Sequence, residues 1–255
     1  MKEMLNRVPE VTIWFWLIKV LSTTVGETAA DFLSITLGLG LTITTYIMAG
    51  LLIISLFNQF RLKRYVPSSY WTVVVLISIM GTLITDLLVD NYGMSLKFAS
   101  TMFTIALVSI FVIWYAVEKT LSVHTIFTFK RETFYWLAIL FTFSLGTAAG
   151  DLAAESLGLG FFYSLLAFAG LIALIATAYY GLNMNSILAF WLAYILTRPL
   201  GASAGDLLSQ PIANNGLGFG TVSTSAIFLT VISSLVIYLG LQQKKQLHPV
   251  ESKEQ

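Results

Sequence analysis

Seven acidic residues lie inside or beside apolar stretches of this chain, where an ionised side chain is costly. They are Glu27, Asp31, Asp86, Asp90, Asp151, Glu155 and Asp206. Within a bilayer, a carboxylate is expected to face a partner, the interior of a helix bundle or a water-filled cavity. Carboxylates gathered at one depth offer oxygen ligands to a hard cation. The chemistry that these residues predict is therefore cation binding.

The acids follow a repeated spacing. One template, Trp, nine residues, Gly, four residues, Asp, occurs as Trp16/Gly26/Asp31, Trp71/Gly81/Asp86, Trp136/Gly146/Asp151 and Trp191/Gly201/Asp206. A second polar residue lies four positions away, on the same helix face; the pairs are Glu27 with Asp31, Asp86 with Asp90, Asp151 with Glu155, and Asp206 with Gln210. With each Trp at a membrane interface, each Asp lies about 22 Å further along its helix, inside the bilayer.

Small residues precede the acids. The segments "GTAAGD" and "GASAGD" contain GxxxG steps, which let helix backbones approach closely, so the acids are expected where helices cross. The alternative is that each Asp only caps a helix end or turn, by accepting backbone N–H bonds. For Asp90 and Glu155, near the predicted outer loops, simple hydration is an equally good interpretation.

Eight apolar stretches must position these acids, since about 20 residues cross a hydrocarbon core. They run over approximately 12–35, 41–60, 70–89, 96–117, 133–154, 161–180, 186–208 and 219–241. Of the 255 residues, 57% are hydrophobic and 11% are charged, and the mean hydropathy is +0.83, which is typical of a membrane protein. We predict an all-α integral membrane protein with a single transmembrane domain over 1–255, whose first stretch is retained rather than cleaved as a signal peptide.

The template divides the chain into four tandem helical hairpins. We predict them at approximately 12–60, 70–117, 133–180 and 186–241, followed by a polar cytoplasmic tail at 242–255. A glycine follows the Asp by seven residues in three copies (Gly38, Gly93 and Gly158), and Gly216 is the expected counterpart in the fourth. Each unit has two helices, so all four enter the membrane in the same direction. This predicts pseudo-symmetry about the membrane normal, with the four odd-numbered helices around a shared centre.

Basic residues predict the orientation. Eleven of the fourteen fall at the termini or in alternate loops, which places both termini in the cytoplasm by the positive-inside rule. Only Lys19 and Arg198 lie at comparable depth within the apolar spans. We expect Lys19 to snorkel to the cytoplasmic face, with a buried ion pair as the alternative. Arg198 precedes the helix-perturbing Pro199 and is expected to pair with an acid or to gate. The stretch "FKRET", residues 129–133, is predicted to be a solvated linker rather than a nucleic-acid site.

Several longer motifs are also distinctive: "WLIKVLSTTVGETAADFLS", "GTAAGD", "ILTRPLGASAGDLL" and the two "LGLG" turns. In these, over roughly residues 12–240, the chain resembles a family of polytopic bacterial membrane proteins built from tandem copies of a repeat of unknown function. The resemblance implies the architecture and a multi-pass location in the bacterial cytoplasmic membrane. It implies no substrate.

Three functions fit these residues. The first is transport of a cation, with Asp31, Asp86, Asp151 and Asp206 as ligands of a hard metal ion such as Mn²⁺, Mg²⁺ or Ca²⁺, and with Glu27, Asp90 and Glu155 beside them. Na⁺ and organic cations are the alternative substrates. Crowded carboxylates cannot all stay ionised, so protons are expected to couple to the cation. The second is a scaffold or sensor, in which the acids hold the bundle together. The third is an intramembrane aspartyl enzyme, which "SAGD" supports weakly because the first glycine of the GxGD motif is absent.

The remaining patterns exclude other classes. Without cysteine the chain has no thiol chemistry, and no zinc helix, serine elbow or phosphate loop occurs. We therefore expect no enzyme activity, no cofactor and no nucleic-acid partner, and the partners expected are the cation, protons and the lipid bilayer. The oligomeric state is left open.

Overall fold

The chain folds into eight long α-helices. The computed structural model describes residues 6–247, and no strand occurs among them. The helices are α1 (Ile13–Asp31), α2 (Gly40–Arg61), α3 (Pro67–Asp86), α4 (Leu96–Glu118), α5 (Phe129–Asp151), α6 (Gly160–Gly181), α7 (Ser186–Ser209) and α8 (Thr221–Leu247). All eight predicted stretches are helical. The predicted tail is helical as far as Leu247, and its residues 248–255 lie outside the described part of the chain.

The odd-numbered helices form a closed inner ring. α1 packs against α3, α3 against α5, α5 against α7, and α7 against α1. In α3, α5 and α7, 56% of the most apolar span is buried, compared with 6–22% in α2, α4, α6 and α8. The prediction that the odd helices surround a shared centre is confirmed.

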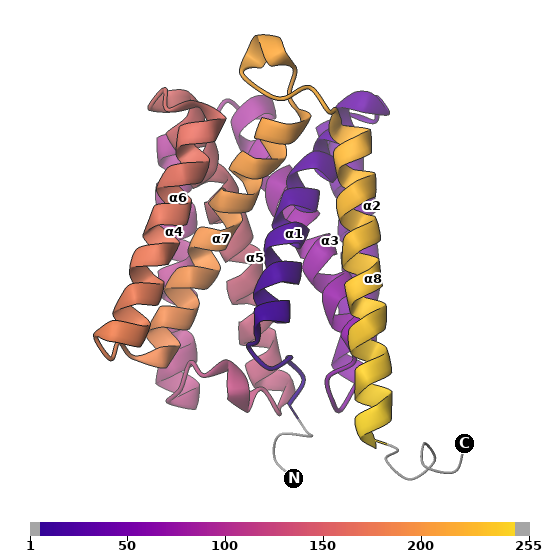
Figure 1. Cartoon of the computed structure of the whole chain (residues 1–255), viewed down its shortest axis with the longest axis vertical. Coiled ribbons are helices and arrows are strands. Elements are labelled where there is room, and N and C mark those ends of the chain that lie inside the picture. The colour runs from indigo at the N-terminus through magenta and orange to yellow at the C-terminus, as the bar shows by residue number, and fades with distance from the viewer. Residues whose placement is uncertain (1–5, 248–255) are drawn as a thin grey trace.

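The outer helices connect neighbouring repeats. Each packs on the inner helix of the next repeat, α2 on α3, α4 on α5, α6 on α7 and, closing the circle, α8 on α1. Figure 1 shows α8 lying alongside α1 although the two are at opposite ends of the sequence. A predicted hairpin is therefore not a packing unit by itself, because its returning helix packs mainly on the following repeat.

Seven of the eight helices are long and apolar enough to cross a membrane; α1 is the exception. Lys19, Glu27 and several hydroxyl residues lower the hydropathy of α1. These side chains face the inside of the ring, since Lys19 and Glu27 are both buried.

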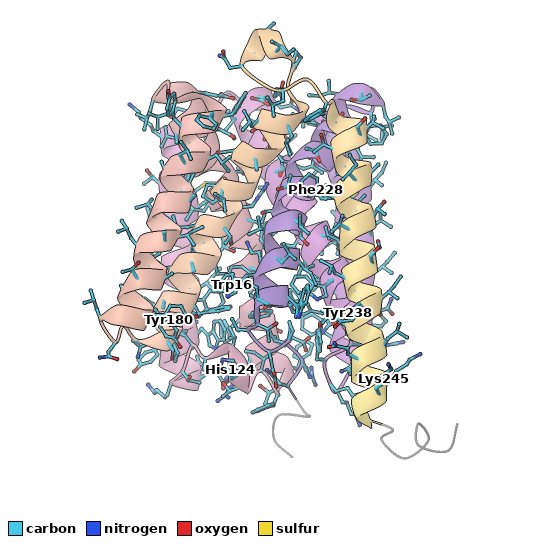
Figure 2. The ribbon with its side chains drawn as sticks, in the orientation of Figure 1. Trp16, His124, Tyr180, Phe228, Tyr238 and Lys245 are labelled. Atoms are coloured by element: carbon cyan, nitrogen blue, oxygen red, sulfur yellow. The ribbon has the colours of Figure 1, made fainter. Side chains whose placement is uncertain are left out.

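The two ends of the bundle differ in chemistry. We call "basic end" the end at which residues 6–12, the C-terminal end of α8 and the segments 62–66, 119–128 and 182–185 lie (Figure 1). We call "acidic end" the end formed by the segments 37–39, 92–95, 157–159 and 210–220. Exposed aromatic side chains, including Tyr180 and Tyr238, lie toward the basic end in Figure 2.

Glycines in the left-handed region make the turns at the acidic end. Gly38, Gly93 and Gly158 have φ of 68°, 69° and 69°, as expected for the predicted turn glycines. In the fourth repeat Gly216 lies in the connection, as predicted, but the positive φ values there fall on Asn215, Gly218 and Gly220. Gly216 is constrained differently, since a Cβ there would lie 2.6 Å from the carbonyl carbon of Gln210.

Three inner helices change from α to π geometry directly after their Asp. The π segments are Phe32–Thr36, Leu87–Asn91 and Leu152–Ser156, while α7 stays α-helical to Ser209. Single π turns are rare in proteins, and those that occur are often found at functional sites. The three template aspartates thus occupy equivalent positions where the helix geometry changes.

Candidate functional site

An acidic cavity opens among the inner helices at the acidic end. Its volume is about 140 Å³, which accommodates several water molecules. It is lined by all seven predicted acids, Glu27, Asp31, Asp86, Asp90, Asp151, Glu155 and Asp206, together with Gln210, Val89, Leu96 and Phe161. Residues as far apart in the sequence as Glu27 and Gln210, 183 positions, therefore meet in one place.

Burial of the acids increases from the mouth of this cavity inward. Asp90 and Glu155 are exposed, the template aspartates Asp31, Asp86 and Asp151 are half-buried, and Asp206 and Glu27 are buried, with 9% and 6% of their surface exposed. Asp90 and Glu155 are exposed, which is consistent with the hydration interpretation, and they also line the cavity.

The capping alternative finds no support in the geometry. Asp31, Asp86 and Asp151 each precede a π segment, and none of the three caps it through a side-chain hydrogen bond. Among the acids of the cavity, only the Glu27 side chain takes part in a hydrogen bond or ion pair within residues 6–247. The other carboxylates present free oxygens to the cavity.

The inner helices approach one another closely at the template glycines, and each template Asp follows its glycine by five residues. Each template glycine faces the next helix of the ring: Gly26 faces Ser78, Gly81 faces Phe143, Gly146 faces Arg198 and Pro199, and Gly201 faces Thr23. A Cβ on Gly81 would lie 2.7 Å from Cβ of Phe143 and 3.0 Å from its carbonyl carbon. The prediction that small residues mark the crossings is confirmed, since any side chain at these positions would push the helices apart.

Arg198 closes the cavity floor. Its side chain is fully buried on α7, and its Nη2 donates to Glu27 Oε2 at 3.0 Å and to Thr147 Oγ1 at 2.7 Å. The same nitrogen also donates to Thr82 Oγ1, and Nη1 donates to the carbonyl oxygen of Thr23 at 2.8 Å. A single guanidinium therefore joins all four inner helices, and it places a fixed positive charge beneath the carboxylates.

Lys19 lies toward the basic end from Arg198, and the prediction that it snorkels is wrong. Its side chain is fully buried, with Nζ 4.4 Å from the ring centroid of Phe143 and 4.3 Å from that of Tyr194. Nζ donates to the carbonyl oxygen of Tyr194 at 3.3 Å, and Lys19 forms no ion pair within the described residues. Lys19 projects into the ring instead of along its outside, so cation–π contacts replace the water that snorkelling would supply.

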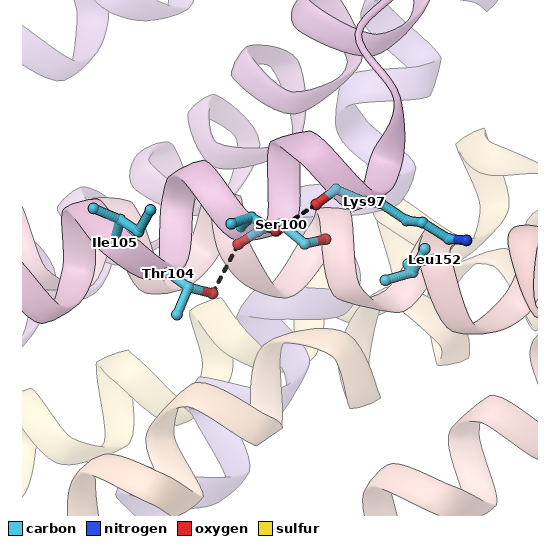
Figure 3. Close-up of a pocket in the computed structure, with 6 residues that line it drawn as sticks. Lys97, Ser100, Thr104, Ile105 and Leu152 are labelled. Atoms are coloured by element: carbon cyan, nitrogen blue, oxygen red, sulfur yellow. Dashed lines mark hydrogen bonds between the residues drawn. The ribbon is translucent and has the colours of Figure 1, made fainter.

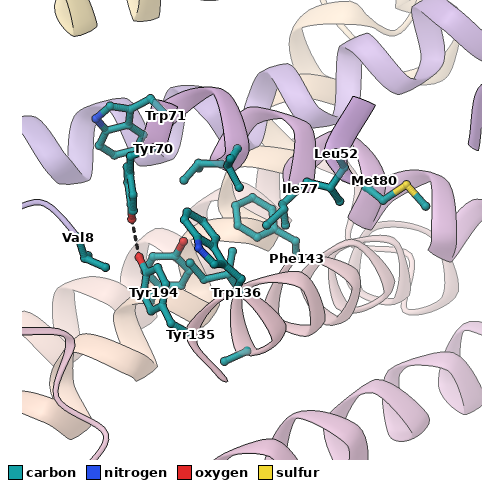
Figure 4. Packing of buried hydrophobic residues seen from close by; sticks show 14 of the residues in the cluster. Val8, Leu52, Tyr70, Trp71, Ile77, Met80, Tyr135, Trp136, Phe143 and Tyr194 are labelled. Atoms are coloured by element: carbon teal, nitrogen blue, oxygen red, sulfur yellow. Dashed lines mark hydrogen bonds between the residues drawn. The ribbon is translucent and has the colours of Figure 1, made fainter. Parts of the chain in front are cut away.

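An aromatic layer seals the ring below Lys19. The hydroxyls of Tyr70 and Tyr135 are hydrogen-bonded, and the rings of Trp71 and Trp136 pack against them, with Tyr194 nearby (Figure 4). All five of these side chains are buried. The acidic cavity is thus open at one end of the bundle and closed toward the other.

Glu132 is a functional candidate that the sequence analysis missed. It lies in "FKRET", predicted to be a solvated linker, but α5 already begins at Phe129 and the Glu132 side chain is only 1% exposed. Its Oε2 accepts a hydrogen bond from Arg7 Nη1 at 2.5 Å, and Oε1 accepts from Gln59 Nε2 at 3.1 Å. Glu132 is buried because Arg7, which is distant in the sequence, covers it.

A larger and shallower hollow of about 360 Å³ lies between α4 and Leu152, the first residue of the π segment after α5 (Figure 3). Lys97 is the one charged residue in its lining. Thr101 and Thr104 donate their hydroxyl hydrogens to carbonyl oxygens of their own helix, of Lys97 at 2.8 Å and of Ser100 at 2.7 Å. The hollow lacks carboxylates, and of its three hydroxyl side chains only that of Ser100 has no hydrogen-bond partner within residues 6–247, so we do not assign the site to it.

Direct metal coordination is absent from the geometry. Among the described residues, no three His, Asp or Glu side chains are arranged to hold one metal ion. Asp31, Asp86, Asp151 and Asp206 share the cavity without forming a ready-made ligand set. A cation in this cavity would be held by charge and through water.

The fold and the cavity define a class: a helical-bundle protein with helices suited to a membrane, built from four repeats around an acidic cavity. The chain belongs to the family described as a Repeat of Unknown Function (DUF347), whose model matches residues 14–65, 69–120, 134–184 and 189–245. The four matches fall on the four Trp-Gly-Asp units. No curated protein and no solved structure matches the chain.

Proposed function

We propose that this protein is a multi-pass membrane transporter of a cation, coupled to protons. The observation that carries the proposal is the convergence of seven carboxylates on one cavity, six of them without a hydrogen-bonding partner among residues 6–247. Carboxylates without partners inside a membrane are unfavourable unless a cation, a proton or water satisfies them. A cation-binding role explains why all four repeats keep the Asp.

The proposed substrate is a hard, hydrated divalent cation resembling Mg²⁺ or Mn²⁺. Mg²⁺ usually keeps several waters and is bound through one or two carboxylates, so it does not need three preformed protein ligands. A cavity of about 140 Å³ leaves room for part of a hydration shell. Carboxylates so close together cannot all be ionised without a cation, so its release is proposed to be linked to proton uptake.

Carrier behaviour, rather than free conduction, is supported by the closed floor. A cation leaving the cavity toward the basic end meets the guanidinium of Arg198, then the ammonium of Lys19 and the aromatic layer. Both charges repel it in a poorly screened interior. Passage therefore requires a rearrangement of the inner ring, which is proposed to close the acidic end as the basic end opens.

The proposed membrane placement follows the sequence. The four repeats would enter the bilayer in the same direction, with pseudo-symmetry about the membrane normal, and the basic end would face the cytoplasm of a bacterial cell. Exposed aromatic residues near the basic end, such as Tyr180 and Tyr238, suit an interfacial belt.

Flux through liposomes tests the function. Purified protein is reconstituted, and uptake of Mg²⁺, Mn²⁺, Ca²⁺ and Na⁺ is measured with and without a pH gradient. We expect a divalent cation to be transported, a pH gradient to change the rate, and Asp151→Asn to lower the rate by at least about tenfold, equivalent to 1.4 kcal/mol. Glu118→Gln is the matched control, because Glu118 pairs with Arg131 at the basic end and lies outside the cavity.

Absence of flux for every cation, from a protein that remains monodisperse, would refute transport and favour the scaffold or sensor. An intramembrane aspartyl enzyme would give a different pattern, because a catalytic pair needs only two of the four template aspartates.

A further inference from the structure

A second buried carboxylate site lies at the basic end, opposite the acidic cavity. Glu132 on α5 is fully buried, and three donors converge on its two oxygens. Arg7 Nη1 lies 2.5 Å from Oε2, while Gln59 Nε2 and Trp136 Nε1 lie 3.1 and 3.3 Å from Oε1. Gln59 is itself fully buried and is oriented by Ser69, whose hydroxyl donates to Gln59 Oε1 at 2.7 Å. Side chains of α2, α3 and α5 thus build this site.

The cation in this site belongs to a short segment that precedes α1. Asn6 fixes the segment to the connection between α4 and α5: its Nδ2 donates to the carbonyl oxygen of Val123 at 3.2 Å, and its Oδ1 accepts from the Ile126 N–H at 3.1 Å. The Tyr65 N–H donates to the Asn6 carbonyl oxygen at 2.8 Å. Val8, 3% exposed, belongs to the same core as Tyr70 and Tyr135 (Figure 4).

The segment therefore covers the basic end while the acidic end is open. Through Asn6, Arg7 and Val8 it contacts connections and helices of the first three repeats, and these must separate if the ring is to open at the basic end. The additional donors from Gln59 and Trp136 leave Glu132 in a prepared polar pocket when Arg7 departs.

We propose that Glu132 is a second cation-binding site, and that Arg7 occupies it as a tethered substitute for the transported cation while the basic end is closed. Departure of residues 6–8 would expose Glu132 to a cation arriving from the acidic cavity. The class of ligand rests on the cation transport proposed above, but the occupancy of Glu132 by Arg7 can be tested without any transport.

Closure by the segment is tested by cysteine labelling. The chain contains no cysteine, so Val8→Cys provides a single reporter at a buried position. Labelling by a maleimide is measured on the full-length protein in detergent, where the reagent reaches both ends. We expect Arg7→Ala to speed labelling at least about tenfold, because it frees the segment. Arg64→Gln is the matched control: it removes a positive charge that is exposed at the basic end and leaves Arg7, Glu132 and the connection that holds Asn6 unchanged, so labelling should stay at the original rate.

Binding of a free cation at Glu132 is tested with guanidinium chloride at low millimolar concentration, against equal sodium chloride. In Arg7→Ala we expect guanidinium to raise the unfolding temperature, because a ligand of the folded state stabilises it. The wild type, already occupied by Arg7, should show no such rise, and neither should Arg7→Ala combined with Glu132→Gln.

Two results would overturn the proposal: unchanged labelling of Val8→Cys when Arg7 is replaced, or a guanidinium effect that is equal with and without Glu132. If Arg7→Ala is not monodisperse, Arg7→Lys replaces it in the labelling experiment. Its shorter reach to Glu132 should speed labelling by a few-fold, and an unchanged rate would equally overturn the proposal. Accelerated labelling and guanidinium binding, with no flux in liposomes, would refute the transport function and leave the Glu132 site standing.

Discussion

Replacement of Arg198 by Gln tests how much the buried Arg198–Glu27 ion pair contributes to stability. The guanidinium is fully buried and binds Glu27 at 3.0 Å, Thr147 at 2.7 Å and the Thr23 carbonyl oxygen at 2.8 Å. Removing one partner of a buried ion pair costs about 3–5 kcal/mol, because the other charge stays buried without compensation. We take about 3 kcal/mol, since the amide of Gln can restore one hydrogen bond. For a domain of this size, that corresponds to an unfolding temperature lower by about 6–12 °C.

The assay is thermal unfolding of the purified protein in detergent, followed by tryptophan fluorescence, at a single scan rate. The double variant Glu27→Gln/Arg198→Gln removes both charges of this pair, so it should lose less stability than the sum of the two single variants, by about 1–3 kcal/mol. Arg64→Gln is the control, because Arg64 is exposed at the basic end. Strictly additive losses, or an Arg198→Gln variant that unfolds like the wild type, would refute the central role of the ion pair.

Three further substitutions test the packing. Gly81→Ala should cost about 1–3 kcal/mol in the same unfolding assay, because the added Cβ would overlap Phe143. Gly170→Ala, on the exposed side of α6, has open space and should gain up to about 1 kcal/mol, so equal effects of the two substitutions would contradict a close helix crossing at Gly81. Lys19→Met should unfold at or above the wild-type temperature, because an apolar side chain of similar length replaces a buried ammonium that has no carboxylate partner. A lower unfolding temperature would show that the cation–π contacts of Lys19 stabilise the fold. Tyr70→Phe should cost about 1 kcal/mol through loss of the hydrogen bond to Tyr135, and Tyr46→Phe, at an exposed ring, should cost nothing measurable.

The repeat made much of the fold and the cavity predictable. Apolar stretches of the length of a bilayer set the eight helices, and the Trp-Gly-Asp spacing set which residues share a depth. Given one inner helix per repeat and a closed ring, Asp31, Asp86, Asp151 and Asp206 had to approach one another. The partners four residues away followed from the helical period. These inferences depend only on regular helix geometry, which residue spacing in the sequence is sufficient to predict.

The features that could not be predicted depend on contacts between distant residues. Glu132 stands next to Lys130 and Arg131, which is typical of a solvated segment, yet Arg7, 125 positions earlier, covers it. Lys19 lies near a helix start, where snorkelling is usual, but the rings of Phe143 and Tyr194 surround it. The π turns after three of the aspartates, and the packing of each outer helix on the next repeat, likewise have no local signal.

The fourth repeat departs from the others where the central charge is needed. Three residues before the template glycine, the first three repeats have Thr23, Ser78 and Phe143, and the fourth has Arg198. One residue after that glycine they have Glu27, Thr82 and Thr147, which are the three side chains that the guanidinium binds, and the fourth has Ala202.

A ring with an arginine in every repeat would crowd four like charges on the axis, which the buried interior cannot support. One long cationic side chain and three short acceptors fill the same space with a single charge and a single counter-ion. The repeated Asp residues therefore line the cavity, and Arg198, the residue by which the fourth repeat differs, places a positive charge at its closed end.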